Sequence, residues 1–254
     1  MVVGGVTVVS ALADALADNP GRPLVTFYDG STGERVELSV KTFDNWVGKI
    51  ANLLGDDLLI EPGELVCVDL PTHWQSTVTL LAAWTCGLRV WLGGGGARPV
   101  DVAASVVGAA ALSNPGTVVG QPIACSLQPL GGPFRGDLPA GWLDFGREVP
   151  SQPDVLLTAS STRRTDVAIE ADGGSLTHEQ LVDRAFGTAA EQGIAAGGRL
   201  ITDANPARAG EVAAGLVAPL VAGASVVLVA NCDAEALRMI SDQERVTASY
   251  WVTR

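Results

Sequence analysis

Apolar and polar residues follow two patterns along the chain, one with helical spacing and one of short unbroken apolar runs. Residues 41–57 place large apolar side chains on a single stripe, which predicts an amphipathic helix. The apolar run 64–70 then predicts a buried strand, and residues 74–87 and 88–92 predict a second helix and a second strand. Short apolar strands between helices are typical of an α/β fold with mainly parallel sheets flanked by helices.

The same order of elements returns in residues 175–230. Residues 62–66 correspond there to 196–200, and residues 85–87 correspond to 221–223, with a glycine before a strand in each case. One interpretation is that the chain contains two related βα-layered halves. The alternative is chance similarity, because any two strand–helix–strand units share this order of elements.

We therefore predict a first α/β half in residues 1–111 and a second in residues 154–254, which can pack together as one globular domain. The segment 112–153 between them is rich in proline and glycine, which interrupt helices, and it has room for short strands at 117–120 and 123–127. This segment is predicted to connect the two halves.

The last elements of the chain are a predicted helix at 234–246 and a predicted strand at 246–252. No further strand sequence follows the second one. A strand at the edge of a sheet presents unpaired backbone groups. We therefore expect a second copy of the chain or another protein to cover this edge.

Composition narrows the classes of partner. The chain has 254 residues, of which 47% are hydrophobic and 17% charged, as in a globular protein. Its formal net charge of -12 argues against nucleic acid and anionic membranes as partners, because both are bound through clusters of Lys and Arg. The charge is also what a solubilising surface requires.

The cysteines and the apolar segments indicate a cytoplasmic protein. The longest uncharged run, 212–230, is divided by Pro219 and Gly223 and predicts a helix, a turn and a buried strand instead of a membrane span. The N-terminal residues 1–23 lack the basic start of a signal peptide. The cysteines have neither the spacing of a zinc site nor that of a disulfide framework, and they lie at Cys67, Cys86, Cys125 and Cys232.

Five stretches carry a family resemblance. Residues 22–54, 60–92, 154–181, 212–229 and 234–247 resemble, in the same order, the AMP-binding, adenylate-forming enzymes, which include acyl-CoA synthetases, luciferases and peptide-synthetase adenylation domains. Together with the linking sequence LQPLGGPFRGDLPAGWLDFGREV, they are also similar to short actinobacterial proteins related to this family. The resemblance implies the fold of the N-terminal domain of an adenylate-forming enzyme.

The resemblance also locates a phosphate loop. The family's loop reads T-S-G-[ST]-T-G-x-P-K-G and falls on residues 158–167, where serine, arginine and valine replace the three glycines and Asp166 replaces the lysine. Glycine lets successive N–H groups point at a phosphate, and lysine attracts its charge, so these replacements imply a degenerate site. The candidate binding residues that remain are Thr158, Ser160, Ser161, Thr162, Arg163 and Arg164.

Two functional interpretations stay open. Adenylate-forming enzymes join a carboxylate to ATP, but their magnesium-binding glutamate and the C-terminal lid domain with its catalytic lysine have no matching residues here. We therefore expect a non-catalytic homologue that acts as a binding or interaction module, with no cofactor. The alternative is a nucleotide-, CoA- or acyl-binding subunit, or a ligase half completed by another chain, in which Arg163 and Arg164 bind ATP or AMP through bidentate guanidinium contacts.

The two histidines of the chain are candidate catalytic groups. His178 follows Thr177, which forms a capping box with Gln180, so the sequence favours a structural role at a helix start. His73 follows a predicted strand at the sheet edge where α/β proteins bind ligands, and with Trp74 it can either line a pocket or pack against the core.

The glycine-rich run 93–99 is a second candidate for anion binding, with Arg98 as its cation. It follows a predicted strand and precedes a helix predicted near Asp101. The spacing of a dinucleotide-binding loop fails, because arginine and proline occupy its end. A plain connector is the simpler interpretation.

Overall fold

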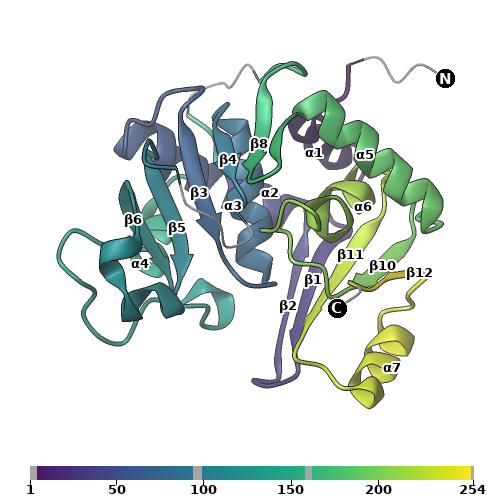
Figure 1. Cartoon of the computed structure of the whole chain (residues 1–254). Coiled ribbons are helices and arrows are strands. Elements are labelled where there is room, and N and C mark those ends of the chain that lie inside the picture. The colour runs from purple at the N-terminus through teal and green to yellow at the C-terminus, as the bar shows by residue number, and fades with distance from the viewer. Residues whose placement is uncertain (1–4, 94–98, 158–161, 253–254) are drawn as a thin grey trace.

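A computed structural model describes residues 5–93, 99–157 and 162–252, which fold into two β-sheets with helices packed between and around them (Figure 1). In the five-stranded sheet the strand order is β12-β10-β11-β1-β2. All neighbours pair in parallel except β1 and β2, which form an antiparallel hairpin. The strands are β1 (Pro23–Asp29), β2 (Glu34–Ser39), β10 (Arg199–Thr202), β11 (Ser225–Ala230) and β12 (Ala248–Tyr250).

The seven-stranded sheet has the order β7-β6-β5-β3-β4-β8-β9. It is also parallel apart from the antiparallel hairpin of β8 and β9. Its strands are β3 (Leu65–Asp69), β4 (Arg89–Trp91), β5 (Ala104–Gly108), β6 (Gln121–Cys125), β7 (Leu143–Asp144), β8 (Val167–Ala171) and β9 (Gly174–Thr177).

The two sheets repeat one arrangement. The order β12-β10-β11-β1-β2 in one sheet corresponds to β5-β3-β4-β8-β9 in the other, including the antiparallel hairpin at the end. The first hairpin in the chain pairs with the late strand β11, and the later hairpin pairs with the early strand β4. The predicted relation between the two halves is therefore present, and each sheet contains strands from both. The boundaries at 111 and 154 stay a prediction.

Helix α3 lies at the centre of the molecule. All of its residues are buried, and it contacts β1 of one sheet and β3 and β4 of the other. Its Trp74 and Trp84 are among the largest fully buried side chains. The helices are α1 (Val8–Asp18), α2 (Val40–Asn52), α3 (Trp74–Thr85), α4 (Phe145–Ser151), α5 (His178–Glu191), α6 (Ala218–Val221) and α7 (Ala234–Gln243), with π-helical turns at Leu53–Asp57 and Ala213–Val217 and 3-10 turns at Ala109–Ser113, Pro115–Thr117 and Pro129–Gly131.

Most predicted elements are confirmed, including the helix of residues 41–57, which ends in a π-helical turn, and the final strand β12. The helix predicted near Asp101 is wrong, because the chain forms strand β5 between β3 and β6 instead. The apolar residues 155–157, which precede the candidate phosphate loop, pair with no described strand. Helix α4 and strand β7 in the connecting segment were not predicted.

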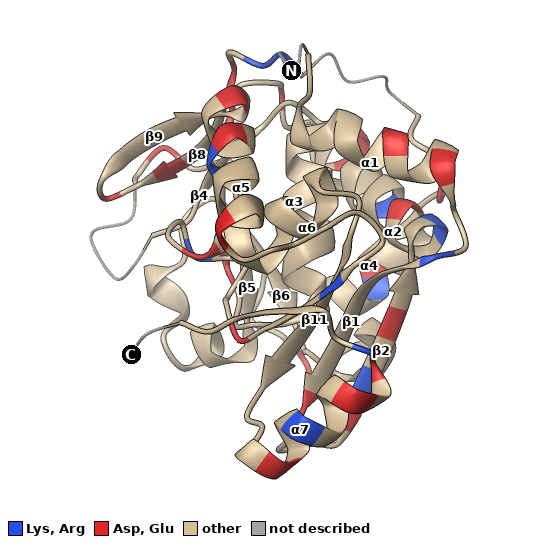
Figure 2. Ribbon diagram, turned by 90° about the vertical axis from the view of Figure 1, so that its right-hand side faces the viewer, with Lys and Arg blue, Asp and Glu red and all other residues tan. Residues whose placement is uncertain are grey.

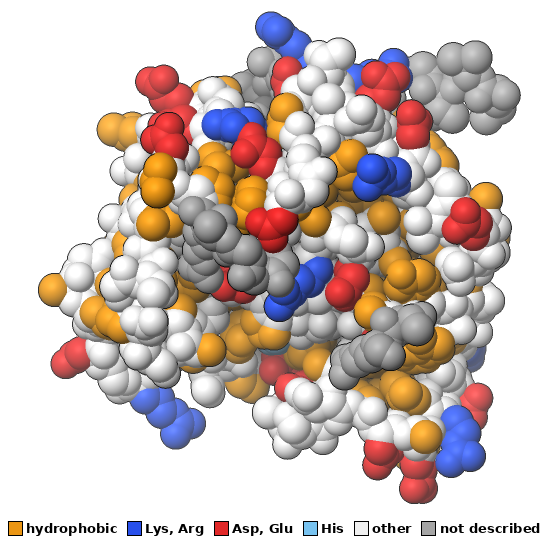
Figure 3. Space-filling model, viewed as in Figure 1, with side chains coloured by type: hydrophobic (Ala, Val, Ile, Leu, Met, Phe, Trp, Pro, Cys, Tyr) orange, Lys and Arg blue, Asp and Glu red, His pale blue; other side chains and the backbone are white. Residues whose placement is uncertain are grey.

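The charged residues are spread over the surface. Asp and Glu occupy positions on α1, α5 and α7 (Figure 2). On the face shown in Figure 3, charged side chains of both signs are interspersed with apolar ones. No helix in the described part of the chain combines the length and the apolar character needed to cross a bilayer.

Candidate functional site

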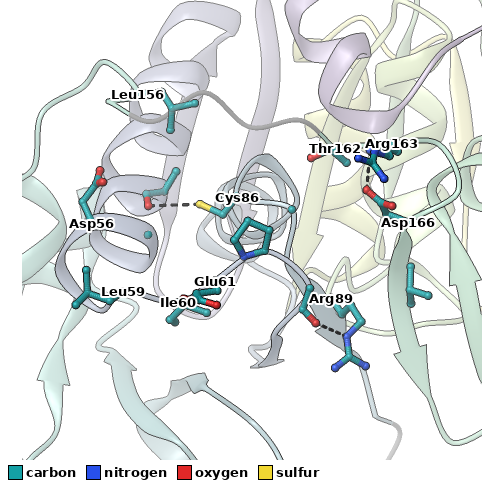
Figure 4. A pocket seen from close by; sticks show the side chains of 16 residues that line it. Asp56, Leu59, Ile60, Glu61, Cys86, Arg89, Leu156, Thr162, Arg163 and Asp166 are labelled. Atoms are coloured by element: carbon teal, nitrogen blue, oxygen red, sulfur yellow. Dashed lines mark hydrogen bonds between the residues drawn. The ribbon is translucent and has the colours of Figure 1, made fainter.

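Two pockets lie at opposite ends of the strands. The first, the amino-end pocket, has a volume of about 640 Å³ and lies where β3, β4 and β8 begin. Figure 4 shows it between the end of α2, the start of β4 and the loop before β8. Its lining includes Gly55, Ile60, Cys86, Arg89, Arg163 and Asp166.

The phosphate-loop candidates lie beside this pocket. Thr158, Ser160 and Ser161 fall outside the described residues. Thr162 and Arg163 line the pocket. The Thr162 hydroxyl donates a hydrogen bond of 2.7 Å to the carbonyl oxygen of Trp84, which attaches the loop to the end of α3.

The carboxylate of Asp166 occupies the position that the family resemblance gives to a lysine. Its Oδ2 accepts a hydrogen bond of 2.8 Å from the backbone N–H of Arg163 (Figure 4). A phosphate loop needs free N–H groups of this kind, and here a side chain of the same loop uses one of them. Arg164 forms an ion pair with Glu179, so its charge is directed to α5.

The start of helix α5 is also occupied by this loop. The N–H groups of His178 and Glu179 donate to the carbonyl oxygens of Asp166 and Arg164, at 3.0 and 2.9 Å. Thr177 caps the next exposed N–H, and the predicted capping box with Gln180 is confirmed. These donors are therefore satisfied within the loop, as helix starts require.

Cys86 is the thiol in the amino-end pocket. Its Sγ lies 3.4 Å from the carbonyl oxygen of Ala51. Burial, with a further contribution from the charge of Asp56, raises the pKa of Cys86 to about 12. The group is a thiol at neutral pH and lacks the thiolate character of a nucleophile.

The second pocket, the carboxyl-end pocket, has a volume of about 460 Å³ and lies beyond the carboxyl ends of β1, β3, β10 and β11. Its polar lining includes Asp29, Glu34, His73 and Asp203, and its apolar lining includes Phe27 and Trp251. The sequence placed His73 at this edge, either in a pocket or packed against the core, and the structure shows both: His73 lines the pocket, and its ring is buried beside Trp74.

His73 caps the start of α3. Its Nδ1 accepts a hydrogen bond of 3.2 Å from the N–H of Gln75, so in the neutral ring the proton lies on Nε2. Nε2 lies 3.8 Å from Oε2 of Glu34, too far for a hydrogen bond. The imidazole ring lies 4.5 Å from the ring of Phe27 and 5.7 Å from that of Trp74, between ring centres.

Glu34 and Asp203 were not predicted as site residues. The rule that ligands bind at the carboxyl ends of parallel strands would have identified Asp203, which directly follows β10. Glu34 begins the return strand of a hairpin, and only the folded chain brings it to His73. Among the described residues, no group of three or more His, Cys, Asp and Glu side chains is arranged to hold a metal ion.

Comparison with known proteins identifies relatives of two kinds. No sequence profile of a protein family matches the chain. The chain is 34% identical over 250 residues to a TIGR03089 family protein of Mycobacterium tuberculosis, with 95% of this chain and 98% of the relative covered.

Solved structures share the fold at lower identity. An acyl-CoA synthetase of Brucella canis matches with a TM-score of 0.80 and 18% identity, over 98% of this chain and 47% of that one. MbtA of Mycobacterium smegmatis matches with a TM-score of 0.74 and 19% identity, over 96% and 48%. The chain thus spans about half the length of these structures, and it has the fold of the N-terminal domain of the adenylate-forming enzymes. By its similarity to the mycobacterial relative, the chain belongs to the TIGR03089 protein family.

Proposed function

We propose that this chain is a non-catalytic relative of the acyl-CoA synthetases that acts as a binding or interaction module. The contact between Asp166 and the backbone N–H of Arg163 is the observation that supports this function most directly. Where the family resemblance gives an ATP-binding loop a lysine and a free donor, this chain has a carboxylate and an occupied donor.

The size of the electrostatic effect favours this proposal. Two like unit charges about 4 Å apart repel each other by roughly 4 kcal/mol near a protein surface, which corresponds to several decades in affinity. Of the two arginines of the loop, Arg164 is already paired with Glu179. A triphosphate at this loop therefore meets a carboxylate at short range and one arginine without fixed geometry.

The test is ATP–pyrophosphate exchange with a panel of aliphatic, aromatic and amino carboxylic acids. We expect no exchange above the background of a reaction without protein. Robust exchange with any acid would overturn the proposal.

A charge-reversal pair tests the role of Asp166 itself. Asp166→Lys is expected to strengthen ATP binding at least tenfold in calorimetric titration, because it removes the repulsion and frees the N–H of Arg163. Asp172→Lys makes the same charge change in the exposed turn between β8 and β9 and is the control. Equal effects of the two substitutions would show that only the net charge matters.

The amino-end pocket supports a second candidate, a nucleotide-, CoA- or acyl-binding subunit completed by another chain. Its volume of about 640 Å³ is in the range of small-molecule sites, and Arg89 and Arg163 line it. This candidate predicts a thermal shift with ATP, AMP or an acyl-CoA that is lost in the double variant Arg163→Ala, Arg164→Ala. No change in melting temperature with any of the three ligands would exclude this second candidate function.

The proposed setting is the cytoplasm, with a protein and not a nucleic acid or a membrane as partner. The cysteines are free thiols, and the net charge is -12. Among the described strands, β12 pairs with β10 and lies at the edge of the five-stranded sheet, so a second copy or another protein can extend the sheet there. Light scattering tests for the second copy.

A further inference from the structure

The carboxyl-end pocket contains a buried carboxyl group with one unpartnered oxygen. The side chain of Glu34 is 6% exposed, and its Oε1 accepts no hydrogen bond from the described residues. The neighbouring His73 side chain is 4% exposed, and its Nε2 also lacks a hydrogen-bond partner there. Buried polar groups in folded proteins are almost always satisfied, so the free Oε1 of Glu34 indicates a missing donor group.

The charged residues that line the pocket indicate the charge of its ligand. Asp29, Glu34 and Asp203 all line it, and its described lining contains no Lys or Arg. Partial burial opposes ionisation of Asp29, but hydrogen bonds from Ser31 and Asn231 outweigh it and lower the pKa of this carboxyl below its usual value. The pocket therefore attracts a cation and repels a phosphate or a carboxylate.

The apolar side chains that line the pocket favour an organic cation over a metal ion. Phe27, Leu127, Val229 and Trp251 supply apolar and aromatic surface, and the volume of about 460 Å³ holds a small molecule. A bare metal ion is disfavoured, because the described His, Cys, Asp and Glu side chains form no ligand cluster. Aromatic rings beside a carboxylate are suited to an ammonium group with an apolar body.

We propose that the carboxyl-end pocket binds an organic primary amine as its ammonium cation, which donates a hydrogen bond to Glu34 while its apolar body lies against Phe27 and Trp251. The pocket is at the opposite end of the strands from the loop of Asp166. The assignment is therefore independent of whether the chain forms adenylates, and exchange and amine binding are scored separately.

The experiment uses 2-phenylethylamine as the probe, with 2-phenylethanol and 3-phenylpropionate as neutral and anionic counterparts. We expect calorimetry and thermal shift at low ionic strength to detect the amine. The alcohol should bind at least tenfold more weakly, and the carboxylate should not bind detectably. Equal binding of all three would overturn the proposal, as would no binding of the amine, which would leave only a water-filled pocket.

Two charge-removing variants locate the site. Glu34→Gln should weaken binding of 2-phenylethylamine at least tenfold. It should also raise the melting temperature of the unliganded protein, because a buried acidic group with an unsatisfied oxygen becomes an uncharged amide. The matched control, Glu61→Gln, makes the same change at the exposed lining of the amino-end pocket and should leave binding unchanged.

A purely structural Glu34 would give the opposite pattern, a lower melting temperature with unchanged amine affinity, and this result would overturn the assignment. If Glu34→Gln does not fold, Glu34→Asp keeps the charge on a shorter side chain. The amine, alcohol and carboxylate ranking on the wild-type protein then decides the proposal by itself.

Discussion

At the scale of single residues, His178 combines a structural position with an unusual protonation equilibrium. It is the first residue of α5, is 1% exposed and packs edge-on against Trp84. Burial lowers the pKa of His178 to about 4, although the charge of Asp166 opposes the shift. The neutral ring is therefore part of the folded state at physiological pH.

This protonation equilibrium predicts a pH-dependent stability. In the unfolded chain the histidine pKa is about 6.5, so between that value and 4 the unfolded state binds a proton that the folded state does not. The contribution of His178 to the free energy of unfolding should be fully present above pH 6.5. It should fall by roughly 3 kcal/mol as the pH decreases to 4. Urea unfolding across this range measures the loss.

The variant His178→Gln should flatten this profile, because glutamine does not titrate. The chain has two histidines, so His73→Gln is the control that retains the His178 contribution. An equally steep loss of stability in His178→Gln would contradict the assignment.

At the scale of elements, the repeat between the two sheets extends to backbone geometry. Gly63 and Gly197 precede β3 and β10 with φ of 88° and 72°, and Gly87 and Gly223 precede β4 and β11, each with φ of 70°. The N–H of Gly63 donates to the carbonyl oxygen of Gly87 at 2.9 Å, and that of Gly197 donates to Gly223 at 3.0 Å. The glycine correspondence read from the sequence thus reflects one turn used twice.

Because the same turn precedes β3 and β10, a glycine-to-alanine substitution should lower the stability of the protein equally at both places. Gly63→Ala and Gly197→Ala should each destabilise the protein by about 1–2 kcal/mol in chemical denaturation, because an L-residue is strained at positive φ. Open space surrounds the new methyl group at both positions, so the strain is the whole effect. Gly21→Ala, where φ is not positive, is the control and should be neutral. A cost at only one of the two positions would contradict their equivalence.

The helices and strands also show which elements could be predicted from the sequence and which could not. Long periodic segments such as residues 41–57 were predicted correctly, because one face of a helix must be apolar to be buried. Strand β5 contains two valines, which favour a strand, but the alanines at 103–104 and 109–111 favour a helix locally. Pairing with β3 and β6 overrides this helical preference. Residues 153–157 satisfy their backbone groups differently: the side chain of Asn52 bonds to Pro153, Val155 and Leu157 in place of a strand.

Some residues of the candidate sites could also be predicted from the sequence, and others could not. The loop around Asp166 and the position of His73 were accessible from the sequence, because each lies next to a recognisable strand or helix start. The contact between Glu34 and His73 was not, because Glu34 begins β2 and His73 precedes α3, and the two residues meet only in the folded chain.

At the scale of the whole molecule, each sheet contains strands from both related halves of the chain. Strand β1 pairs with β11 over five residues, and β4 pairs with β8. One hydrophobic core includes buried residues of both sheets and of the helices between them. Neither half of the chain can therefore complete a sheet alone, even though each half contains a full set of related elements.

This arrangement predicts the behaviour of a cleaved chain. A specific protease site inserted between Arg135 and Gly136, both exposed, separates β1–β6 from β7–β12. After cleavage the two fragments should co-elute in native size-exclusion chromatography and separate only in denaturant, because the β1–β11 and β4–β8 pairs and the shared core hold them together. Each fragment expressed alone should be insoluble or unfolded, since β1 and β4 of the first fragment lose β11 and β8 of the second, and the reverse holds for the second fragment. Independent folding of either fragment, or their separation in native buffer, would show that the two ends of the chain are autonomous domains.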